Sequence, residues 1–275
     1  MCPQTRKYYT IIVHYGSSGS TNAALASLAN CQLPPDDIIV VDNARQLYNS
    51  PENVKHRLIR PGRNTGYAGG INTGIGALAS RGAAEDDIVV VMNNDISIPS
   101  GAFRKLRKWW QTHPADSLLG VSGGHINLRT GRTYPHQPAS RAHHLGYIDG
   151  AFLAAPYSVF LKTKGFPGHY FMYWEDALFS TRVRRLGLPL RIIPDTQLHH
   201  QSFSDTDKNS DKLYYLVRNG ALFLEQETPL PWRLYWYLAN RARLVYHTTR
   251  PHGSPIVRRA LFDAVRGITG PRKKQ

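Results

Sequence analysis

Residues 88–95 read Ile-Val-Val-Val-Met-Asn-Asn-Asp, an apolar run that stops abruptly at three polar side chains. A short, uninterrupted apolar run rich in β-branched residues is typical of a strand that is buried on both faces of a sheet. Similar runs occupy residues 8–13 and 38–41, and residues 54–59 alternate as a further strand would. Segments with helical spacing, such as residues 21–30, separate these runs. The first half of the chain therefore predicts an α/β fold with a mostly parallel sheet covered by helices on both faces.

Polar residues follow two of the predicted strands directly. Asp42 comes after the second strand, and Asn93, Asn94 and Asp95 come after the fourth. In an open α/β sheet, ligands bind outside the carboxyl ends of the strands. Carboxylate and amide oxygens suit Mg²⁺ or Mn²⁺ and can also bind a ribose or a phosphate. The same three residues are equally ordinary in a turn, so this motif alone leaves both interpretations open.

The composition indicates a folded protein with a strong positive charge. The 275 residues include 34 Lys and Arg against 19 Asp and Glu, which gives a net charge of +15, and 41 % of residues are hydrophobic. This apolar fraction excludes a disordered polyelectrolyte. The two cysteines, Cys2 and Cys31, exclude a disulfide scaffold and fit a reducing compartment. With no apolar signal core near residue 1, we expect a cytoplasmic protein that is soluble or bound to a membrane surface.

The positive charge is concentrated near the carboxyl end. Residues 226–275 contain ten Lys and Arg against Glu227 and Asp263. Within them, residues 231–246 mix Trp and Tyr with Arg along a predicted helix. Such a helix suits a membrane interface that carries anionic lipid, but a helix packed on the main domain with a solvated basic face would read the same way. Charge alone also leaves nucleic acid or a phosphorylated substrate open.

A glycine-rich segment at residues 63–76 precedes a predicted helix that ends near residue 82. Glycines permit close approach of the backbone to a diphosphate, and a helix N-terminus favours anions. The segment matches neither the dinucleotide-binding pattern nor the P-loop pattern, so it indicates little by itself.

The second half of the chain is less regular. We predict strands at residues 121–127, 147–154 and 190–193, and helices at residues 101–112, 174–186 and 214–224.

Three groups in this half carry reactive side chains. Glu175 and Asp176 stand at the start of a predicted helix, where one could act as a general base, although acidic residues also favour a first turn. An imidazole of His199 or His200 could complete a metal site begun by Asp95, and a satisfied polar histidine is the alternative. Arg218 could clamp a phosphate or carboxylate, or form a surface ion pair.

The order of the motifs is more informative than any one of them. Along the chain occur VDNA (41–44), RNTGYAGGINTGI (63–75), VVVMNNDI (89–96), GAFLA (150–154), FMYWEDALF (171–179) and LHHQSFSD…YYLVRN (198–219). Over residues 8–224 this series resembles the inverting family 2 glycosyltransferases of GT-A fold, in particular rhamnosyltransferase-like and galactofuranosyltransferase-like members. The resemblance implies a Rossmann-like, mixed but mostly parallel sheet flanked by helices. It implies a catalytic domain at 1–225, with a nucleotide-sugar half (about 1–98) and an acceptor half (about 99–225), followed by a basic helical tail at 226–275.

The resemblance also assigns roles to residues. Asp176 corresponds to the catalytic base and Glu175 to its supporting neighbour. Asp95 corresponds to the metal ligand, and His199 or His200 to a further one. The donor would be bound by Val13, Tyr15, Asp42, Asn64, Gly66, Asn72, Asn93, Asn94 and Asp95, and the acceptor by Gly150, Trp174 and Arg218. Because the DXD-type motif is written Asn-Asn-Asp here, its first position cannot supply an anionic ligand.

The activity implied is transfer of a sugar, with inversion, from a UDP-, dTDP- or GDP-linked donor to a hydroxyl of a glycan or lipid-linked acceptor, assisted by Mn²⁺ or Mg²⁺. Such a reaction serves the assembly of polysaccharides or glycoconjugates, including those of the cell envelope. Two alternatives remain at this point. A sugar nucleotidyltransferase would normally carry a basic, glycine-rich phosphate loop, and residues 16–21 contain no Arg or Lys. A basic nucleic-acid-binding protein would fit the charge, but the chain contains no recognisable nucleic-acid-binding motif.

Overall fold

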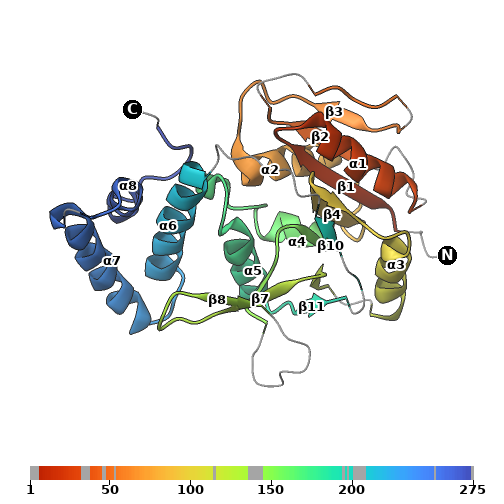
Figure 1. The fold of residues 1–275 in the computed structure, drawn as a ribbon. Helices are drawn as coiled ribbons and strands as arrows, with labels where there is room; N and C mark the ends of the chain where they lie inside the picture. The colour runs from red at the N-terminus through yellow and green to blue at the C-terminus, as the bar shows by residue number, and fades with distance from the viewer. Residues whose placement is uncertain are drawn as a thin grey trace.

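The computed structural model describes residues 6–31, 38–44, 48–52, 54–113, 116–135, 145–193, 196, 198–200, 209–250 and 252–273. Within these residues the central sheet has seven strands in the order β11-β6-β10-β4-β1-β2-β3 (Figure 1). The parallel strands of its first half are β1 (Tyr8–His14), β2 (Ile38–Asp42), β3 (Arg57–Ile59) and β4 (Ile88–Asn93). Its second half contains β6 (Leu118–Gly120), β10 (Phe152–Pro156) and β11 (Leu190–Ile192), of which β10 runs antiparallel to both of its neighbours. The expectation of a mixed, mostly parallel sheet is confirmed.

Helices cover both faces of this sheet. Alternate side chains of each central strand point to opposite faces, so each strand contributes to two separate cores. The first core lies under α1 (Ser18–Ala29) and α3 (Ala102–Thr112). The second lies under α2 (Gly66–Ala79), α4 (Tyr157–Lys162) and α5 (Glu175–Arg185). Burial on both faces explains why the strand sequences are apolar without interruption.

The glycine-rich segment forms the body of α2, so the prediction that it leads into a later helix was wrong. A Cβ atom at Gly70 would stand 2.7 Å from Cγ1 of Val13, and one at Gly74 would stand 2.6 Å from Cγ2 of Ile11. The glycines therefore let α2 lie directly on β1. Their role at these two positions is close packing of a helix on a strand.

The predicted strand at residues 147–154 is interrupted. Tyr147–Ile148 form β9, which joins β7 (Gly123–Ile126) and β8 (Thr133–Pro135) in a small sheet, whereas the chain enters the central sheet at Phe152. The break falls at residues 149–151, beside the candidate site. A second small sheet pairs β5 (Ile96–Ser97) with β12 (His199–His200).

Three helices form a layer at the carboxyl end, on the far side of α5 from the sheet (Figure 1). They are α6 (Asn209–Gln226), α7 (Trp232–Thr249) and α8 (Pro255–Val265). Leu178 of α5, Leu222 of α6, Trp236 of α7 and Leu261 of α8 share one buried cluster. The basic tail is therefore helical, as expected, and it packs against the rest of the chain. No helix among the described residues is long and apolar enough to cross a membrane.

Candidate active site

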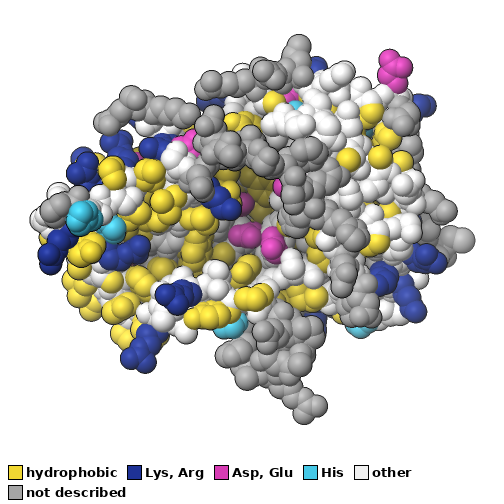
Figure 2. Space-filling view, in the orientation of Figure 1, with side chains coloured by type: hydrophobic (Ala, Val, Ile, Leu, Met, Phe, Trp, Pro, Cys, Tyr) yellow, Lys and Arg dark blue, Asp and Glu magenta, His cyan; other side chains and the backbone are white. Residues whose placement is uncertain are grey.

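Backbone pairing brings the two halves of the candidate site together. Asp95 follows β4, and the N–H of Asn93 at the end of that strand donates to the carbonyl of Ala151 at 2.9 Å. One residue earlier, the N–H of Gly150 donates to Oδ2 of Asp176 at 3.0 Å. Asp95 and Asp176 thus approach the same edge of the sheet from distant parts of the chain. Figure 2 shows acidic side chains gathered at the hollowed centre of this face.

Tyr67 lies in the neighbourhood of four acidic residues of the candidate site. Its hydroxyl donates to the carbonyl of Gly150 at 2.7 Å. Burial raises the pKa of Tyr67 well above its usual range, and four neighbouring carboxylates raise it further. They belong to Glu175, Asp176, Asp149 and Asp95. All four carboxylates therefore lie near enough to the Tyr67 phenol to influence its ionisation.

Asp176 is held as a carboxylate of raised basicity. Burial raises its pKa to about 6, the N–H groups of Gly150 and Ala177 oppose this shift, and Asp149 adds to it. A Cβ atom at Gly150 would stand 3.2 Å from Cβ of Asp176, so a side chain there would press on the carboxylate and shift it by a few tenths of an ångström. A pKa near 6 leaves the carboxylate ionised at neutral pH and still able to accept a proton.

Glu175 differs from its neighbour in burial. It is 7 % exposed, and among the described residues no group hydrogen-bonds its Oε2. Burial, and then the charge of Asp176, raise its pKa well above the usual range. Glu175 is thus the more deeply buried of the two and Asp176 the more accessible, and the raised pKa of each agrees with the difficulty of ionising two adjacent carboxylates together.

The turn before Glu175 has an unusual backbone. Phe171, Tyr173 and Trp174 have φ of 69°, 64° and 70°, a region that residues with a side chain rarely adopt. Each such residue costs about 1–3 kcal/mol and persists only where the surroundings hold it. The turn thus depends on contacts from elsewhere in the fold.

Helix α6 supplies those contacts. The Nδ2 of Asn219 donates to the carbonyls of Met172, Tyr173 and Tyr170 at 2.7, 2.9 and 2.9 Å. Arg218 adds a bond from Nη2 to the carbonyl of Tyr170 at 3.1 Å. Together these two side chains fix the backbone that leads into the acidic pair.

The prediction that Arg218 binds the acceptor does not agree with its position. Its side chain is fully buried, and its remaining donors bond Oδ1 of Asn219 at 2.9 Å and the carbonyl of Gly270 at 2.7 Å. Each of the three guanidinium nitrogens donates within the protein, so we assign Arg218 to holding the turn. Trp174 lies at the turn itself, packed on Phe223 with ring centroids 5.2 Å apart, and its contact with an acceptor remains a prediction.

Two residues expected to bind the donor also hold the structure. Both ends of the Asn72 amide bond the backbone of Phe166, at 2.8 and 2.9 Å, so Asn72 holds that segment of the chain, and its contact with a donor remains a prediction. Gly66 has φ of 75°, and a Cβ atom there would stand 2.3 Å from the carbonyl oxygen of Phe171. Gly66 therefore permits α2 to contact the strained turn, and its role in donor binding remains a prediction. Asn64 is exposed, and its Oδ1 accepts from the N–H of Gly66 at 2.8 Å.

The other expected donor residues lie at the ends of β1, β2 and β4. Asp42 accepts bonds from the N–H groups of Ala44 at 3.0 Å and Tyr48 at 3.2 Å, and pairs with Arg60 at 3.4 Å. Tyr15 is 48 % exposed. Its carbonyl accepts from Nδ2 of Asn94 at 3.2 Å. Val13, one residue before the end of β1, is buried and pairs in register with Asn93, the last residue of β4.

Asp95 has a feature that suits a divalent cation. Its Oδ1 is buried, and no group in the described part of the chain bonds it. In the pairing of β5 with β12, His200 lies opposite Ile96, so the backbone of the two histidines runs beside Asp95. The side chains of His199 and His200 lie outside the described residues. Among the described side chains, no three His, Cys, Asp or Glu residues converge on a point. Asp95 fits a cation site that these histidines would complete.

Sequence reasoning did not single out Asp149 or Asn219. The Oδ1 of Asp149 accepts from the N–H of Ala151 at 3.0 Å, which shapes the break between β9 and β10. The Asp149-Gly150 pair is a turn signal within an otherwise strand-like run, and could have indicated that break. Nothing local in the sequence indicates the contacts of Asn219, because they lie 46–49 residues away.

Comparison with known proteins agrees with this arrangement. The family described as Glycosyl transferase family 2 matches residues 9–179, well over half of the chain. An N-acetylglucosaminyl-diphospho-decaprenol L-rhamnosyltransferase of Mycobacterium tuberculosis (strain ATCC 25618 / H37Rv) is 24 % identical over 285 residues, which cover 87 % of this chain and 92 % of the relative.

Solved structures share the fold at lower identity. TarS 1–349 of S. aureus in complex with UDP-GlcNAc is 15 % identical and superposes with a TM-score of 0.59. The match covers 95 % of this chain and 81 % of the TarS chain. The mannosyltransferase PcManGT of Pyrobaculum calidifontis, in complex with GDP-Man and Mn²⁺, is 16 % identical, with coverage of 96 % and 87 % and a TM-score of 0.55.

Proposed function

The chain belongs to glycosyl transferase family 2 and has the GT-A fold, and from its site we propose that it transfers a sugar with inversion from a nucleoside diphosphate-sugar to an acceptor hydroxyl. The observation that carries this proposal is the placement of Asp176, whose raised pKa and backbone hydrogen bonds suit a general base. Membership of this family sets aside the alternatives of a nucleotidyltransferase and a nucleic-acid-binding protein.

In the proposed reaction Asp176 takes the proton of the acceptor hydroxyl. The acceptor oxygen then forms a bond to the anomeric carbon from the face opposite the diphosphate, whose own bond to that carbon breaks with its electron pair. The backbone N–H groups of Gly150 and Ala177 orient the carboxylate for this transfer. A positioned general base contributes about 10²–10⁴-fold in rate.

Asp95 would hold a divalent cation, together with His199 or His200. A Mn²⁺ or Mg²⁺ ion bound there would neutralise charge on the departing diphosphate. The unpartnered, buried Oδ1 of Asp95 supports this role. The Mn²⁺ reported with PcManGT, which shares the fold, is consistent with it.

The donor would lie along the carboxyl ends of β1, β2 and β4. Asp42 would read the base, while Tyr15, Asn64, Asn93 and Asn94 would line the same edge. For the acceptor we propose a glycan on a lipid diphosphate. The name of the relative of M. tuberculosis, which describes a decaprenol-linked substrate and rhamnosyl transfer, supports this class of acceptor and a deoxysugar donor.

A direct test incubates the purified protein with UDP-, dTDP- and GDP-sugars, Mn²⁺ or Mg²⁺, and a polyprenyl diphosphate-linked N-acetylglucosamine. We expect one donor to yield a lengthened glycan whose new linkage has the opposite anomeric configuration to the donor, as measured by NMR. Retention of configuration would contradict the role of Asp176 as a base acting on the acceptor.

A further inference from the structure

We propose that the outer face of α7 docks the protein on an anionic lipid surface. Leu230, Leu234, Leu238 and Val245 are 74 %, 56 %, 58 % and 61 % exposed. Their spacings of four, four and seven residues place them along one side of the helix and of the residues that lead into it. We call these four residues the α7 stripe. Large apolar side chains exposed in a row normally mark an interaction surface.

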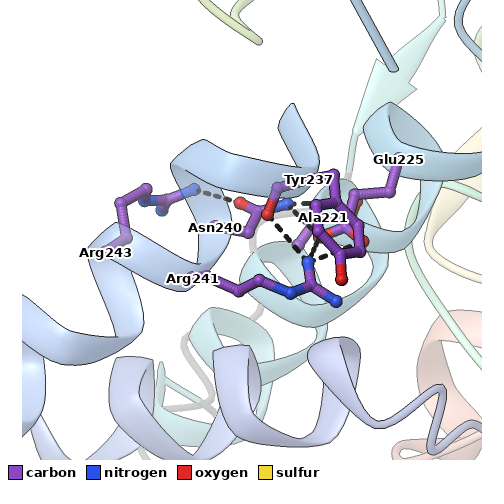
Figure 3. Close-up of polar contacts among 6 residues, drawn as sticks. All are labelled: Ala221, Glu225, Tyr237, Asn240, Arg241 and Arg243. Atoms are coloured by element: carbon purple, nitrogen blue, oxygen red, sulfur yellow. Dashed lines mark hydrogen bonds and ion pairs between the residues drawn. The ribbon is translucent and has the colours of Figure 1, made fainter. Parts of the chain in front are cut away.

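Contacts on the opposite side of α7 hold the helix so that the α7 stripe faces away from the rest of the protein. Trp236 is buried and its Nε1 donates to the carbonyl of Leu128 at 2.7 Å. Asn240 is fully buried and donates to Oε1 of Glu225 at 2.9 Å. Figure 3 shows Asn240 and Arg241 both reaching Glu225 on α6, with Arg243 bonding Asn240 from the other side. Rotating α7 to hide the stripe would break all of these contacts.

The charges around the stripe favour an anionic partner. The two acidic residues of the tail are already paired: Glu227 bonds Arg185 at 2.7 Å, and Asp263 bonds Arg259 at 3.1 Å. The exposed arginines of the tail also include Arg233, Arg250, Arg258 and Arg266. In Figure 2, Lys and Arg side chains stand among hydrophobic ones over the α7 end of the molecule.

Exposed aromatic side chains favour a lipid interface over a second copy of the chain. Tyr235, Tyr237 and Tyr246 are 48 %, 46 % and 56 % exposed, and tyrosine favours the boundary between headgroups and acyl chains. In a symmetric dimer each arginine-rich tail would face its own copy, and the like charges would repel. An anionic lipid surface can bind both kinds of group, because its acyl chains contact the apolar side chains and its headgroups attract the arginines.

Helix α3 offers an internal comparison. It carries Arg104, Lys105, Arg107 and Lys108, but its large apolar residues Phe103, Leu106 and Trp110 are buried. Helix α3 thus presents positive charge without an apolar stripe. If positive charge alone decided lipid binding, both helices would contribute. A comparison of α3 with α7 therefore separates the effect of charge from the effect of the exposed apolar side chains.

The test measures binding of the full-length protein to vesicles by flotation. The wild type should bind vesicles of phosphatidylcholine mixed with phosphatidylglycerol, and bind phosphatidylcholine alone much more weakly. Changing Leu234, Leu238 and Val245 together to Ser should lower the partition coefficient by at least about tenfold, because each side chain loses its apolar burial. The matched control changes Leu161 and Leu186, which are exposed on α4 and at the end of α5, to Ser and should bind as the wild type.

A second pair of variants tests the charge. Arg250→Gln with Arg258→Gln should weaken binding about fivefold per charge removed, whereas Arg104→Gln with Lys108→Gln on α3 should leave it unchanged. Circular dichroism and urea unfolding establish that each variant is folded. Three results would each overturn the proposal. They are no binding of the wild type to anionic vesicles, equal losses from the α3 pair and from the Arg250 and Arg258 pair, and a dimer in solution that the stripe variant dissociates.

Discussion

The side-chain nitrogen of Asn219 donates to the carbonyl oxygen of Tyr173 across 2.9 Å, and so ties α6 to the residue that stands two positions before Glu175. Tyr173 is one of three residues with positive φ in the turn, and the same Asn219 nitrogen also reaches the carbonyls of Tyr170 and Met172. The position of the acidic pair is therefore set by a helix that itself contributes no proposed reacting group.

Replacing Asn219 by Ala should lower both stability and turnover. Three carbonyls would lose their donor, at a cost of about 1–3 kcal/mol in the free energy of unfolding. We expect kcat to fall at least about tenfold, because the general base loses its alignment, while the donor Kd stays near the wild-type value. Asn240→Ala is the matched control, since Asn240 is as buried and bonds Glu225 away from the site. It should lose stability and keep kcat. Equal losses of kcat in both variants would rule out positioning by Asn219.

Two glycines of α2 should respond oppositely to alanine. Gly66→Ala places a Cβ atom 2.3 Å from the carbonyl oxygen of Phe171 at φ of 75°, so it should displace the turn, destabilise the fold and reduce kcat. At Gly76 an added Cβ atom meets nothing within 4 Å, and Gly76→Ala should stabilise the protein by about 0.5–1 kcal/mol through helix propensity. Urea unfolding and steady-state kinetics measure both effects. A neutral Gly66→Ala variant would show that the turn is not held there.

The activity should fall on the acid side of about pH 6. Asp176 must be ionised to accept a proton, and burial raises its pKa to about 6, so kcat/KM should decline as the pH drops below that value. Asp176→Asn should lose about 10²–10⁴-fold in kcat and leave the donor Kd unchanged. The pKa of Asp176 is higher in the folded state than its unfolded value of 3.8. Its contribution to the free energy of unfolding therefore decreases as the pH rises from about 4 to about 6. Asp176→Asn should remove this decrease. Wild-type turnover in Asp176→Asn would eliminate this residue as the base.

Asp149 should shift the same pH profile. Its negative charge is one of the causes that raise the pKa of Asp176, so Asp149→Asn should move the acid limb to lower pH. Asp116→Asn is the control, because Asp116 pairs with Lys162 on the surface. A profile measured on kcat/KM separates this electrostatic effect from a loss of fold, which would lower the rate without moving the limb. An unmoved limb in Asp149→Asn would contradict the assignment.

Asp95→Ala should abolish the dependence of donor binding on a divalent cation. The comparison is the donor Kd with Mn²⁺ and with a chelator, by isothermal calorimetry. In the wild type Mn²⁺ should tighten binding, whereas in Asp95→Ala the two values should coincide because the ligand that anchors the cation is missing. Asp86→Asn, an exposed carboxylate before the same strand, should behave as the wild type. A normal Mn²⁺ response in Asp95→Ala would remove the cation from this position.

The sheet could be predicted because each central strand repeats one local signal. Residues 88–92 were expected to form a strand, and β4 runs over Ile88–Asn93, since burial on both faces demands apolar residues throughout. The Asp149–Ala151 break was missed, because residues 147–154 were interpreted as strand throughout although they serve two sheets.

The support of the site could not be predicted, because it depends on contacts between distant residues. Arg218 looks like an exposed clamp in the sequence, and only the fold shows that its guanidinium is enclosed by carbonyls 48 and 52 residues away. Likewise, Phe171, Tyr173 and Trp174 have no sequence preference for positive φ. The site therefore follows from a family resemblance and a local pattern of polar residues, whereas the residues that hold it follow from packing.

The bond from Arg218 to the carbonyl of Gly270 sets a limit on shortening this enzyme. The N–H of Gly270 in turn donates to the carbonyl of His169, so Gly270 is bonded both to α6 and to the segment that leads into the strained turn. Truncation after residue 225 would remove the carbonyl that accepts from the buried guanidinium of Arg218, and would expose the apolar side of α6 that packs on α7 and α8. We therefore expect the protein truncated after residue 225 to aggregate or fail to fold. The smallest stable unit extends at least to residue 272.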